Sequence, residues 1–338
     1  MSKLLIVYGT RPEYIKIHPL VEALRETDID FDVLRVTQHE DIIDFNPSDP
    51  TFRISPDIAP NRLDCIFASI TSQSSFLEPY SHILVQGDTA TACAVALCAF
   101  NARKKVIHLE AGLRTYNVDH PYPEEVYRRM ISSMTAIHLC PTKDNEFNLL
   151  MESVAGQYFV VGNTVLDNLI GMGATRDKAS YGNKILVTMH RRENHKLMSD
   201  WFARISNLAK KYPRYEFILP LHPNPEVSKH KDLLKGVNVV APMSHKKIVD
   251  LLLECKMCIS DSGGIQEEAS FLGKKVIVCR YFTERTEGIG TFFHMCWTPT
   301  ELPKLFGQVI KNCEIDEPCP FGDGNSAQKI VKLLKKEL

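Results

Sequence analysis

The sequence predicts an α/β protein with two domains and mainly parallel sheets, and three observations support this fold class. Short apolar runs alternate along the chain with longer segments of helical periodicity. Most of these runs are apolar throughout, which is typical of strands buried on both faces of a parallel sheet flanked by helices. A length of 338 residues indicates two domains, at about 150 residues for each. The repeated strand–helix order therefore favours two open α/β sheets.

The expected strands are defined by β-branched and apolar composition between polar segments. They are residues 3–8, 32–37, 82–87, 105–110, 136–140, 158–162, 184–189, 215–220, 237–242, 256–260 and 275–279. Helical patterns lie between them, for example at 89–103 and 196–212. The chain ends in an amphipathic helix with Asn325 or Ser326 as its N-cap. Small and polar residues at 171–183 interrupt the alternation, so we place the domain boundary close to them.

Composition excludes several classes of function. Hydrophobic residues make up 44% and charged residues 24% of the chain, and the net charge is −1, so nothing indicates a nucleic-acid partner. No apolar run approaches the ~18 residues of a membrane span, and the run at 4–8 is too short for a signal peptide. We therefore expect a cytoplasmic protein without a membrane partner.

The cysteine pattern predicts buried free thiols in a reducing compartment. Most of the ten cysteines lie inside apolar runs. Cys255 and Cys258 form a C-x-x-C pair, but no second pair of ligands stands at a spacing suited to zinc. Neither the dinucleotide-binding G-x-G-x-x-G nor the P-loop motif occurs. We expect no metal and no cofactor.

Polar residues follow six of the expected strands at the point where each strand ends. These segments are residues 9–13, 87–89, 110–114, 190–194, 222–225 and 261–264. A single such residue has an ordinary structural explanation; Asp88, for example, could be the N-cap of the next helix. Their recurrence is informative because the carboxyl ends of parallel strands converge on one crevice, where ligands bind.

Two of these segments suggest an anionic substrate. Pro12 fits the first position of a helix, so Arg11 stands at a helix start and can bind a phosphate. Ser262, Gly263 and Gly264 open another helix, whose free N–H groups and positive dipole end attract anions. With the carboxylates and histidines of the other segments, this composition suits a diphosphate-linked substrate and acid/base chemistry at the linked group.

Nine blocks in order along the chain resemble the non-hydrolysing bacterial type of UDP-N-acetylglucosamine 2-epimerase. They are GTRPEYIK, TQHE, VQGDTATA, HLEAGLRT, PYPEEVYRRM, VGNTVLDNL, VTMHRREN, SDSGGIQEEASFLGK and TERTEG. The resemblance implies a GT-B-like fold of two Rossmann-like domains with the active site in the interdomain cleft. It implies an N-terminal domain at 1–168 with the catalytic carboxylates, a UDP-binding domain at 169–322, and a helix at 323–338 that packs back on the first domain.

The resemblance also implies a reaction, the reversible conversion of UDP-GlcNAc to UDP-ManNAc. Elimination of UDP gives 2-acetamidoglucal, and UDP then adds back as a proton reaches the other face of C2. The implied catalytic residues are Asp88, Glu110, Glu124 and His190, with no assignment of carboxylates to faces. The implied substrate-binding residues are Arg11, Lys16, His222, Ser262, Gly263, Gly264, Glu268 and Arg280. Glu268 is expected to bind the ribose hydroxyls. Glu267 is expected to complement the helix dipole in the first turn of the same helix. The protein is expected to form a homodimer.

Some positions depart from the family, and alternatives stay open. Gln38 and His39 match part of a second site at which family members bind UDP-GlcNAc as an activator, whereas Asn61 and Arg62 replace a glycine–glutamine pair of the family. A hydrolysing 2-epimerase that releases ManNAc and UDP is one alternative. A GT-B glycosyltransferase is the second, since a fold does not determine a function. A catalytically inactive nucleotide-sugar sensor is the third.

Overall fold

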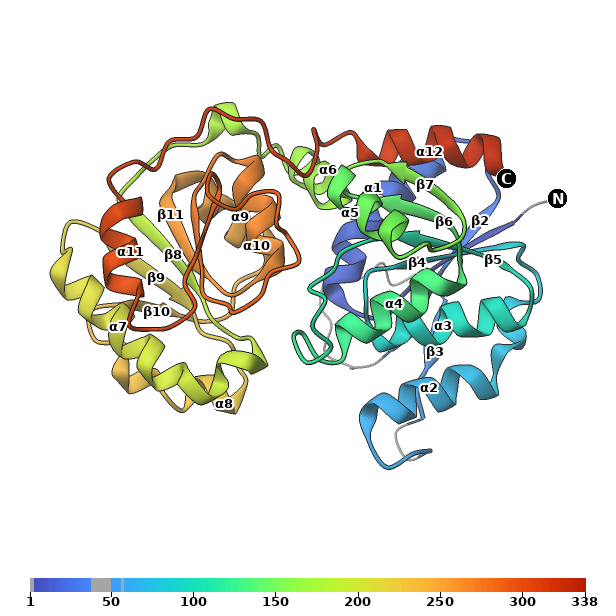
Figure 1. The fold of residues 1–338 in the computed structure, drawn as a ribbon, viewed down its shortest axis with the longest axis horizontal. Helices are drawn as coiled ribbons and strands as arrows, with labels where there is room; N and C mark the ends of the chain where they lie inside the picture. The colour runs from blue at the N-terminus through green and yellow to red at the C-terminus, as the bar shows by residue number, and fades with distance from the viewer. Residues whose placement is uncertain (1–2, 38–49, 56–57) are drawn as a thin grey trace. The chain divides into compact units, whose positions relative to one another are not determined.

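The computed structural model of the chain describes residues 3–37, 50–55 and 58–338. It divides into two compact units, shown in Figure 1. Unit 1 contains Met1–Asn168 and Gly322–Leu338, and unit 2 contains Leu169–Phe321. Each unit has one open parallel sheet with helices around it, so the predicted α/β class is confirmed. No helix in the described ranges has both the length and the apolar character needed to cross a membrane.

Unit 1 contains a seven-stranded sheet in the order β3-β2-β1-β4-β5-β6-β7, and every pairing in it is parallel. Its strands are β1 Leu4–Tyr8, β2 Phe31–Thr37, β3 Thr51–Arg53, β4 His82–Gln86, β5 Lys105–Leu109, β6 Thr135–Cys140 and β7 Gln157–Val160. Every residue of β1 and β4 is buried, as expected for central strands of a parallel sheet; β1 is apolar throughout, and β4 also buries His82 and Gln86 at its two ends.

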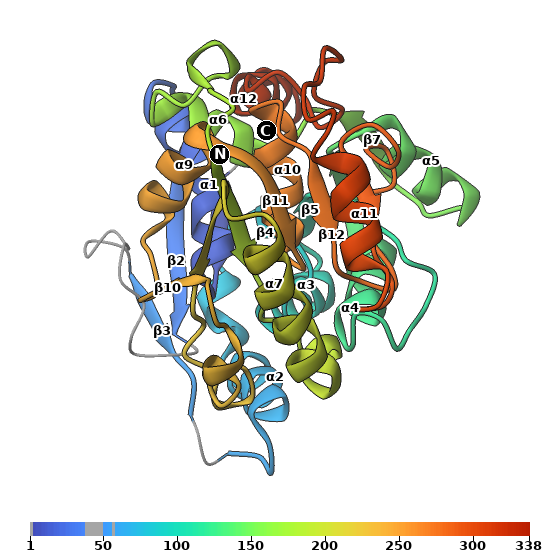
Figure 2. The same ribbon diagram turned by 90° about the vertical axis from the view of Figure 1, so that its left-hand side faces the viewer.

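The helices of unit 1 connect these strands. They are α1 Arg11–Arg25, α2 Arg62–Ser72, the short 3₁₀ helix η1 Ser74–Leu77, α3 Ala90–Asn101, α4 Glu124–Met134, α5 Lys143–Met151 and α6 Thr164–Gly171, whose last residues belong to unit 2. Helix α12, Ser326–Glu337, returns from unit 2 and packs beside α1, as Figure 2 shows. Leu20 and Leu24 of α1 share a buried cluster with Ile330 and Leu334 of α12.

The start of α12 is stabilised by a residue far away in the sequence. Asn325 occupies the N-cap position, as predicted, but its side chain makes no capping hydrogen bond. Asp167 of α6 instead accepts a hydrogen bond from the backbone N–H of Ala327 at 2.8 Å. The C-terminal helix is therefore attached to unit 1 by a polar contact as well as by its apolar face.

Unit 2 contains a six-stranded parallel sheet in the order β10-β9-β8-β11-β12-β13. Its strands are β8 Lys184–Thr188, β9 Glu216–Pro220, β10 Asn238–Val240, β11 Cys255–Ser260, β12 Val276–Val278 and β13 Phe293–Met295. Its helices are η2 Arg176–Lys178, η3 Arg192–Leu197, α7 Met198–Lys211, α8 Pro225–Ser228, η4 Lys231–Leu233, α9 His245–Glu254, α10 Gly263–Phe271 and α11 Leu302–Val309.

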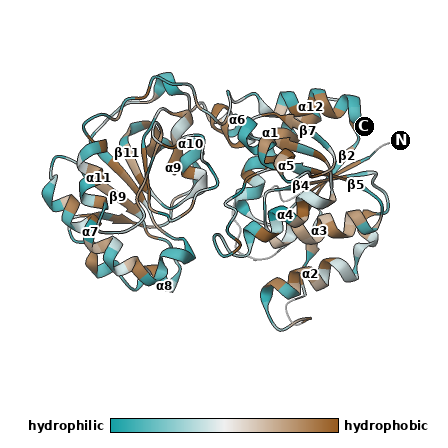
Figure 3. Ribbon diagram, in the orientation of Figure 1, coloured by the Kyte–Doolittle hydropathy of each residue, from teal (hydrophilic) through white to brown (hydrophobic). Residues whose placement is uncertain are grey.

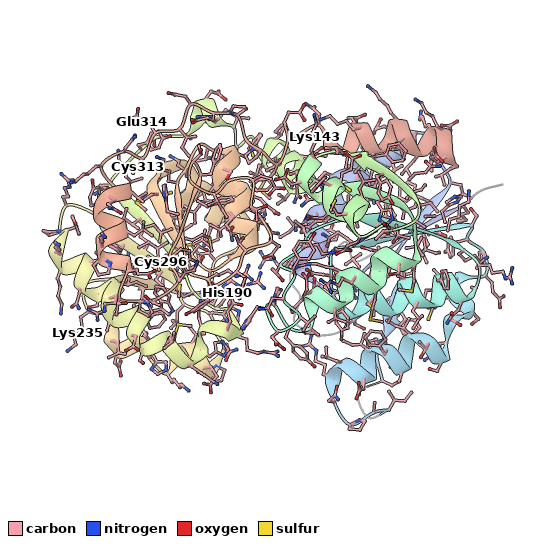
Figure 4. All side chains as sticks on the ribbon, in the orientation of Figure 1. Lys143, His190, Lys235, Cys296, Cys313 and Glu314 are labelled. Carbon is pink, nitrogen blue, oxygen red and sulfur yellow. The ribbon has the colours of Figure 1, made fainter. Side chains whose placement is uncertain are left out.

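Apolar residues concentrate in the sheets, whereas the helices carry both polar and apolar residues (Figure 3). All ten cysteines are free thiols, and nine of them are buried, which confirms the prediction of buried free thiols for those nine. In Figure 4, Cys296 lies inside unit 2, whereas Lys235 lies at its edge and is exposed. The sulfur atoms of Cys255 and Cys258 lie 3.9 Å apart, a distance that corresponds to two thiols and not to a disulfide.

Eleven predicted strands have counterparts in the structure, and two strands were missed. Strands β3 and β13 are three residues long and lie at sheet edges. Strand β3 is largely exposed, and His294 interrupts the apolar residues of β13, whereas the equally short edge strand β10 has two adjacent valines that made it predictable. Helix α1 also differs slightly from the prediction: Thr10 is its N-cap, so Arg11 takes the first helical position and Pro12 the second.

Candidate active site

The strand order of each sheet reverses at one place, and this place defines a crevice at the carboxyl ends of the strands. In unit 1 the reversal lies between β1 and β4, and in unit 2 it lies between β8 and β11. The loops after these four strands carry Arg11, Asp88, His190 and the start of α10.

Glu13 holds together the two loops that border the crevice of unit 1. Its buried carboxylate accepts a hydrogen bond from Gly9 N–H at 2.9 Å and another from the Thr89 hydroxyl at 2.7 Å. Thr89, and not Asp88, is the N-cap of α3. Burial raises the pKa of Glu13, and the hydrogen bonds that it accepts oppose this effect. The carboxylate of Glu13 thus joins the segment that carries Arg11 to the segment that carries Asp88.

Glu110 follows β5 and has an unusual backbone conformation. Its φ of +68° lies in the left-handed region, which costs a residue other than glycine about 1 kcal/mol or more. Its carboxylate accepts a hydrogen bond from the Lys16 ammonium at 2.5 Å and another from the Gln86 side chain. The structure therefore brings the predicted residues Glu110 and Lys16 into direct contact.

Asp88 is held by an arginine from α4. Arg128 donates from Nε at 2.8 Å and from Nη2 at 2.6 Å, both to Asp88 Oδ2. Within the described ranges, Asp88 Oδ1 has no hydrogen-bond partner. Arg128 also contacts Glu125 at 3.2 Å, and Glu125 accepts the N–H groups of Thr115 and Tyr116. One carboxylate oxygen of Asp88 is thus fixed, while the other can accept a proton or a hydrogen bond from a hydroxyl group.

Glu124 opens α4 and is half-buried, one helical turn before Arg128. Acidic and basic residues four positions apart on α4 can form ion pairs, and Glu125–Arg129 at 3.6 Å is one such pair. The longer-range contact of Arg128 with Asp88 could not be predicted from helical spacing. Glu124 therefore lies on the same helix as the arginine that fixes Asp88.

His108 on β5 fixes the peptide just before Asp88. Its Nε2 lies 2.8 Å from the carbonyl oxygen of Gly87, and the N–H of Gly87 donates to Leu109 O at 3.0 Å. The ring is fully buried, and this burial lowers the pKa of His108 to about 3. The imidazole is therefore neutral and donates from Nε2. The N–H and the carbonyl group of Gly87 are thus both hydrogen-bonded to residues of β5. These bonds set the direction in which Asp88 leaves the sheet.

In unit 2, Asp261 holds the loop after β8. Its fully buried carboxylate accepts the backbone N–H groups of His190 at 2.9 Å and Arg191 at 2.9 Å. It also accepts a hydrogen bond from the Asn194 side chain at 3.1 Å. Asp261 follows β11, so this set of bonds spans the strand-order reversal of unit 2 as Glu13 does in unit 1.

The ring of His190 stacks on that of His222, with centroids 5.5 Å apart and an interplanar angle of 18°. Burial lowers the pKa of His190, and the nearby Asp261 carboxylate partly opposes this. Burial also lowers the pKa of His222. The two predicted residues are thus brought together as a pair whose neutral form is favoured, and each ring can act as a hydrogen-bond donor.

Helix α10 begins at Gly263 without a capping side chain. Ser262 occupies the N-cap position, but its side chain makes no capping hydrogen bond. A Cβ atom on Gly263 would lie 2.6 Å from Nη1 of Arg285, so the glycine permits the guanidinium to pack on the backbone. A Cβ atom on Gly264 would have nothing nearer than the Ser262 hydroxyl, at 3.9 Å. The first amides of α10 therefore have no side-chain acceptor, as the predicted anion site requires.

A chain of alternating charges lies behind this helix start. Arg280 contacts Glu193 at 2.8 Å and Glu284 at 3.0 Å, and Glu284 contacts Arg285 at 2.8 Å. Arg285 then contacts Glu267 at 2.6 Å. Glu267 is therefore a buried ion-pair partner and not an isolated first-turn carboxylate that complements the helix dipole. Arg280 is almost fully buried, and its Nη2 has no hydrogen-bond partner within the described ranges and is itself buried from solvent. The structure therefore shows Arg280 as an ion-pair partner and not as an accessible substrate contact.

Glu268 lies one turn after Gly264 on α10 and is also largely buried. Its Oε1 lies 2.8 Å from Nε2 of His245, the first residue of α9. The sequence suggested Glu268 as a site residue but gave no indication of its contact with His245.

The two predicted activator residues, Gln38 and His39, lie outside the described residues. Asn61, which departs from the family pattern, is the N-cap of α2 and accepts the N–H of Asp64 at 3.0 Å. No group of three or more potential metal-binding side chains (His, Cys, Asp or Glu) occurs within the ranges that the structure describes.

Sequence reasoning did not assign roles to Glu13, Asp261, Arg128 or His245. Their partners are far away in the chain: 76 residues separate Glu13 from Thr89, and 71 separate His190 from Asp261. The available signal was weak but present, since Glu13 and Asp261 both stand in polar segments that directly follow strands.

Comparisons with known proteins agree over the whole chain. A family model described as UDP-N-acetylglucosamine 2-epimerase matches residues 71–335. The UDP-N-acetylglucosamine 2-epimerase of Neisseria meningitidis serogroup A is 38% identical over 372 aligned residues, which cover 99% of this chain and 99% of that relative.

Solved structures show the same relationship. The chain is similar to the UDP-GlcNAc 2-epimerase from Neisseria meningitidis bound to UDP-GlcNAc, with a TM-score of 0.85 and 35% identity over 99% of this chain and 100% of that one. It is similar to the Methanocaldococcus jannaschii UDP-GlcNAc 2-epimerase in complex with UDP-GlcNAc and UDP, with a TM-score of 0.81 and 26% identity over 99% and 100% of the two chains. The chain therefore belongs to the UDP-N-acetylglucosamine 2-epimerase family, as its motifs predicted.

Proposed function

We propose that this protein interconverts UDP-GlcNAc and UDP-ManNAc by inverting the configuration at C2. The observation that carries the proposal is the set of carboxylates at the unit 1 crevice: Glu110 bound to Lys16, Asp88 bound to Arg128, and Glu124 on the helix that carries Arg128. The chain is similar over its full length to proteins named UDP-N-acetylglucosamine 2-epimerase, and this similarity supports UDP-GlcNAc as the proposed substrate.

The chemistry requires elimination because the C2 proton of this sugar is not acidic. The C1–O bond breaks and its electron pair leaves with UDP, while a carboxylate removes the C2 proton and the C1=C2 bond of 2-acetamidoglucal forms. UDP then adds back to C1 as a proton reaches C2 on the opposite face. The reaction therefore needs groups that handle protons on both faces, which we assign to Asp88, Glu110 and Glu124.

Unit 2 supplies the groups that suit the diphosphate and the nucleoside. The uncapped amides of Gly263 and Gly264 and the ring of His190 would stabilise the negative charge on departing UDP, whereas the N–H of Ser262 already donates to the Ser260 hydroxyl at 2.9 Å. Glu268 would accept hydrogen bonds from the ribose. His222, stacked on His190, belongs to the same site. Arg11 and Lys16 of unit 1 complete the proposed substrate contacts, and Arg280 supports the start of α10 through its ion pairs with Glu193 and Glu284.

Product analysis tests this proposal. The protein is incubated with UDP-GlcNAc, and the products are identified by NMR, with UDP-ManNAc as the expected product. Glu110→Gln should slow its formation by about 10²-fold or more, whereas Glu78→Gln, which changes an exposed carboxylate of the same unit, should not. Free ManNAc and UDP as the main products would show the hydrolysing reaction instead. Transfer of the sugar to an acceptor without inversion at C2 would show a glycosyltransferase, and no turnover with retained UDP-GlcNAc binding would favour a sensor.

We also propose that the protein is a cytoplasmic homodimer. Helix α5 exposes Phe147, Leu150 and Met151, which are 59%, 53% and 66% exposed, and their spacing places them on one face of the helix. An apolar face of this kind is typical of a surface that another chain covers. Sedimentation equilibrium of wild-type protein and of Leu150→Glu would test this, since the charged variant should be monomeric.

A further inference from the structure

Cys255 and Cys258 form a pair of thiols in the interior of unit 2. Both side chains are fully buried, and their sulfur atoms lie 3.9 Å apart. Cys255 is the first residue of β11, whereas the crevice of unit 2 lies beyond Ser260, the last residue of that strand. The pair is therefore separate from the candidate active site, and the proposed reaction does not use it.

A β-bulge accounts for the contact between two cysteines that are three positions apart on a strand. Residues three apart in a regular strand point to opposite faces of the sheet. The register between β11 and β8 shifts after Cys255, which pairs with Lys184. Cys258 pairs with Leu186, only two positions further along β8. The cysteines thus stand as residues two apart normally do, on one face and with Cα atoms about 6.6 Å apart. This separation lies within the range of about 4.4–6.8 Å that a disulfide bridge allows.

A buried ammonium group lies next to Cys255. Lys274 is fully buried, and its Nζ donates to Cys255 O at 2.9 Å and to Ser180 O at 2.5 Å. The S–H of Cys258 and the positive charge of Lys274 lower the pKa of Cys255, and burial opposes this effect. An isolated buried thiol behaves differently, since burial raises the pKa of Cys93 to about 12. Cys255 is therefore the thiol of the pair that more readily becomes a nucleophilic thiolate.

A redox reaction suits this pair better than metal binding does. A structural zinc ion takes four ligands, and among the described residues no cluster of three or more His, Cys, Asp or Glu side chains occurs. The ammonium of Lys274 also repels a cation at this place. Two thiols on one face with a positive charge next to them instead form the arrangement in which one sulfur becomes a thiolate and the other can react with it once it is oxidised.

We propose that Cys255 and Cys258 are a redox-active dithiol that a hydroperoxide oxidises to an intramolecular disulfide. The Cys255 thiolate attacks one oxygen of hydrogen peroxide, the O–O bond breaks, and the hydroxide that leaves becomes water with the proton that Cys255 released. The Cys258 thiol then attacks the sulfenic acid formed on Cys255, so that the S–S bond forms, the S–O bond breaks and a second water molecule leaves. The two thiols lose two electrons and the peroxide gains them, and a dithiol reductant restores both thiols by exchange.

Burial determines how fast this reaction is. A small oxidant reaches a buried sulfur when a local segment of the chain opens. The segment at 180–182 is bound to the residues just before Cys255, because Ser180 N–H donates to Leu253 O at 2.7 Å and Gly182 N–H donates to Glu254 O at 3.0 Å. We therefore expect the oxidation to be slow and to occur in the folded protein.

Peptide mapping of the wild type tests the proposal. The folded protein is treated with hydrogen peroxide, the remaining thiols are alkylated in denaturant, and tryptic peptides are identified by mass spectrometry. Cleavage after Lys256 separates the two cysteines, so their disulfide joins the peptides 248–256 and 257–274. These linked peptides should form while tryptophan fluorescence shows that unit 2 stays folded, and dithiothreitol should separate them. Formation of the link only after unfolding in urea, or a link between other cysteines in its place, would overturn the inference.

Matched variants test the order of the two steps. In Cys258→Ser the sulfenic acid on Cys255 has no thiol to react with, so dimedone should trap it, whereas Cys255→Ser should be labelled about tenfold less. Cys313→Ser, which replaces another buried cysteine of unit 2, should form the disulfide at the wild-type rate. Lys274→Met should form it about tenfold more slowly, as expected if the ammonium lowers the thiol pKa by one unit. Equal labelling of the two serine variants, or a wild-type rate in Lys274→Met, would contradict the assignment of Cys255 as the thiolate next to Lys274.

Discussion

Replacement of the two glycines at the start of α10 should have opposite effects on stability, although they are adjacent in the sequence. In Gly263→Ala the new Cβ would lie 2.6 Å from Nη1 and 2.8 Å from Cζ of Arg285. The guanidinium cannot move freely, because Arg285 contacts Glu267 at 2.6 Å and Glu284 at 2.8 Å and its side chain is only 5% exposed.

The expected magnitude follows from these contacts. Removal of one partner of a buried ion pair costs about 3–5 kcal/mol, and a displacement that only lengthens the contacts should cost about 2 kcal/mol. In Gly264→Ala the nearest atom would be 3.9 Å away, so the methyl group fits and helix propensity stabilises the protein by up to about 0.8 kcal/mol. For a unit of roughly 150 residues, each 1 kcal/mol shifts Tm by about 2–4 °C.

Tryptophan fluorescence gives a suitable assay. The only two tryptophans of the sequence, Trp201 and Trp297, both belong to unit 2, so their emission reports on the unfolding of the unit that contains α10. Gly263→Ala should unfold about 4–8 °C below the wild type, and Gly264→Ala at or slightly above it. Equal Tm values for Gly263→Ala and the wild type would refute the claim that the packing of Arg285 requires a glycine there.

The remaining predictions concern the two crevices. His190→Ala should lower kcat by about 10²-fold if its ring stabilises the departing diphosphate, and steady-state kinetics would show an unchanged kcat if it does not. Glu110→Gln should lower kcat by about 10²-fold or more with UDP affinity retained in calorimetry; a parallel loss of UDP binding would contradict a role in proton transfer. Asp261→Asn should destabilise unit 2 by about 2 kcal/mol, because an amide group cannot accept three N–H donors; a wild-type urea midpoint by tryptophan fluorescence would oppose this. Because the pKa of His108 falls from 6.5 to about 3 in the folded state, the unfolded chain binds the extra proton between these values, and stability is lost as pH falls through them. Calorimetry at several pH values between 6.5 and 4 should show that the free energy of unfolding of the wild type falls as the pH falls. In His108→Gln this fall should be smaller by up to about 1.4 kcal/mol for each pH unit, and an identical dependence on pH in the two proteins would contradict this.

The strands and the parallel topology could be predicted because burial on both faces leaves a clear trace in the sequence. Every residue of β1 is apolar and buried, and the same holds for β12. Strands β3 and β13 could not be predicted, since β3 is largely exposed and His294 interrupts the apolar residues of β13, unlike the equally short edge strand β10 with its two adjacent valines. The glycine at 263 was predicted from the helix start, but its steric reason, the guanidinium of Arg285, lies 22 positions later in the chain.

The candidate site was predicted as a set of residues and not as a set of contacts. Motifs indicated Glu110 and Lys16 separately, and only the fold brings their charged groups to 2.5 Å. Asp261 was seen as one polar residue after a strand, whereas the structure gives it three N–H donors from the loop that carries His190. Such contacts depend on which loops the strand order of the sheet brings together. The periodicity of apolar residues within one segment of the sequence does not indicate which loops these are.

The most direct test of the central claim follows the proton at C2. The protein is incubated with UDP-GlcNAc in D₂O, and the nucleotide sugars are examined by ¹H NMR and mass spectrometry. Elimination and re-addition predict UDP-ManNAc that carries deuterium at C2, because the proton returned to the sugar comes from carboxyl groups that exchange with solvent. UDP-ManNAc with the original proton at C2, or no UDP-ManNAc at all, would contradict the account.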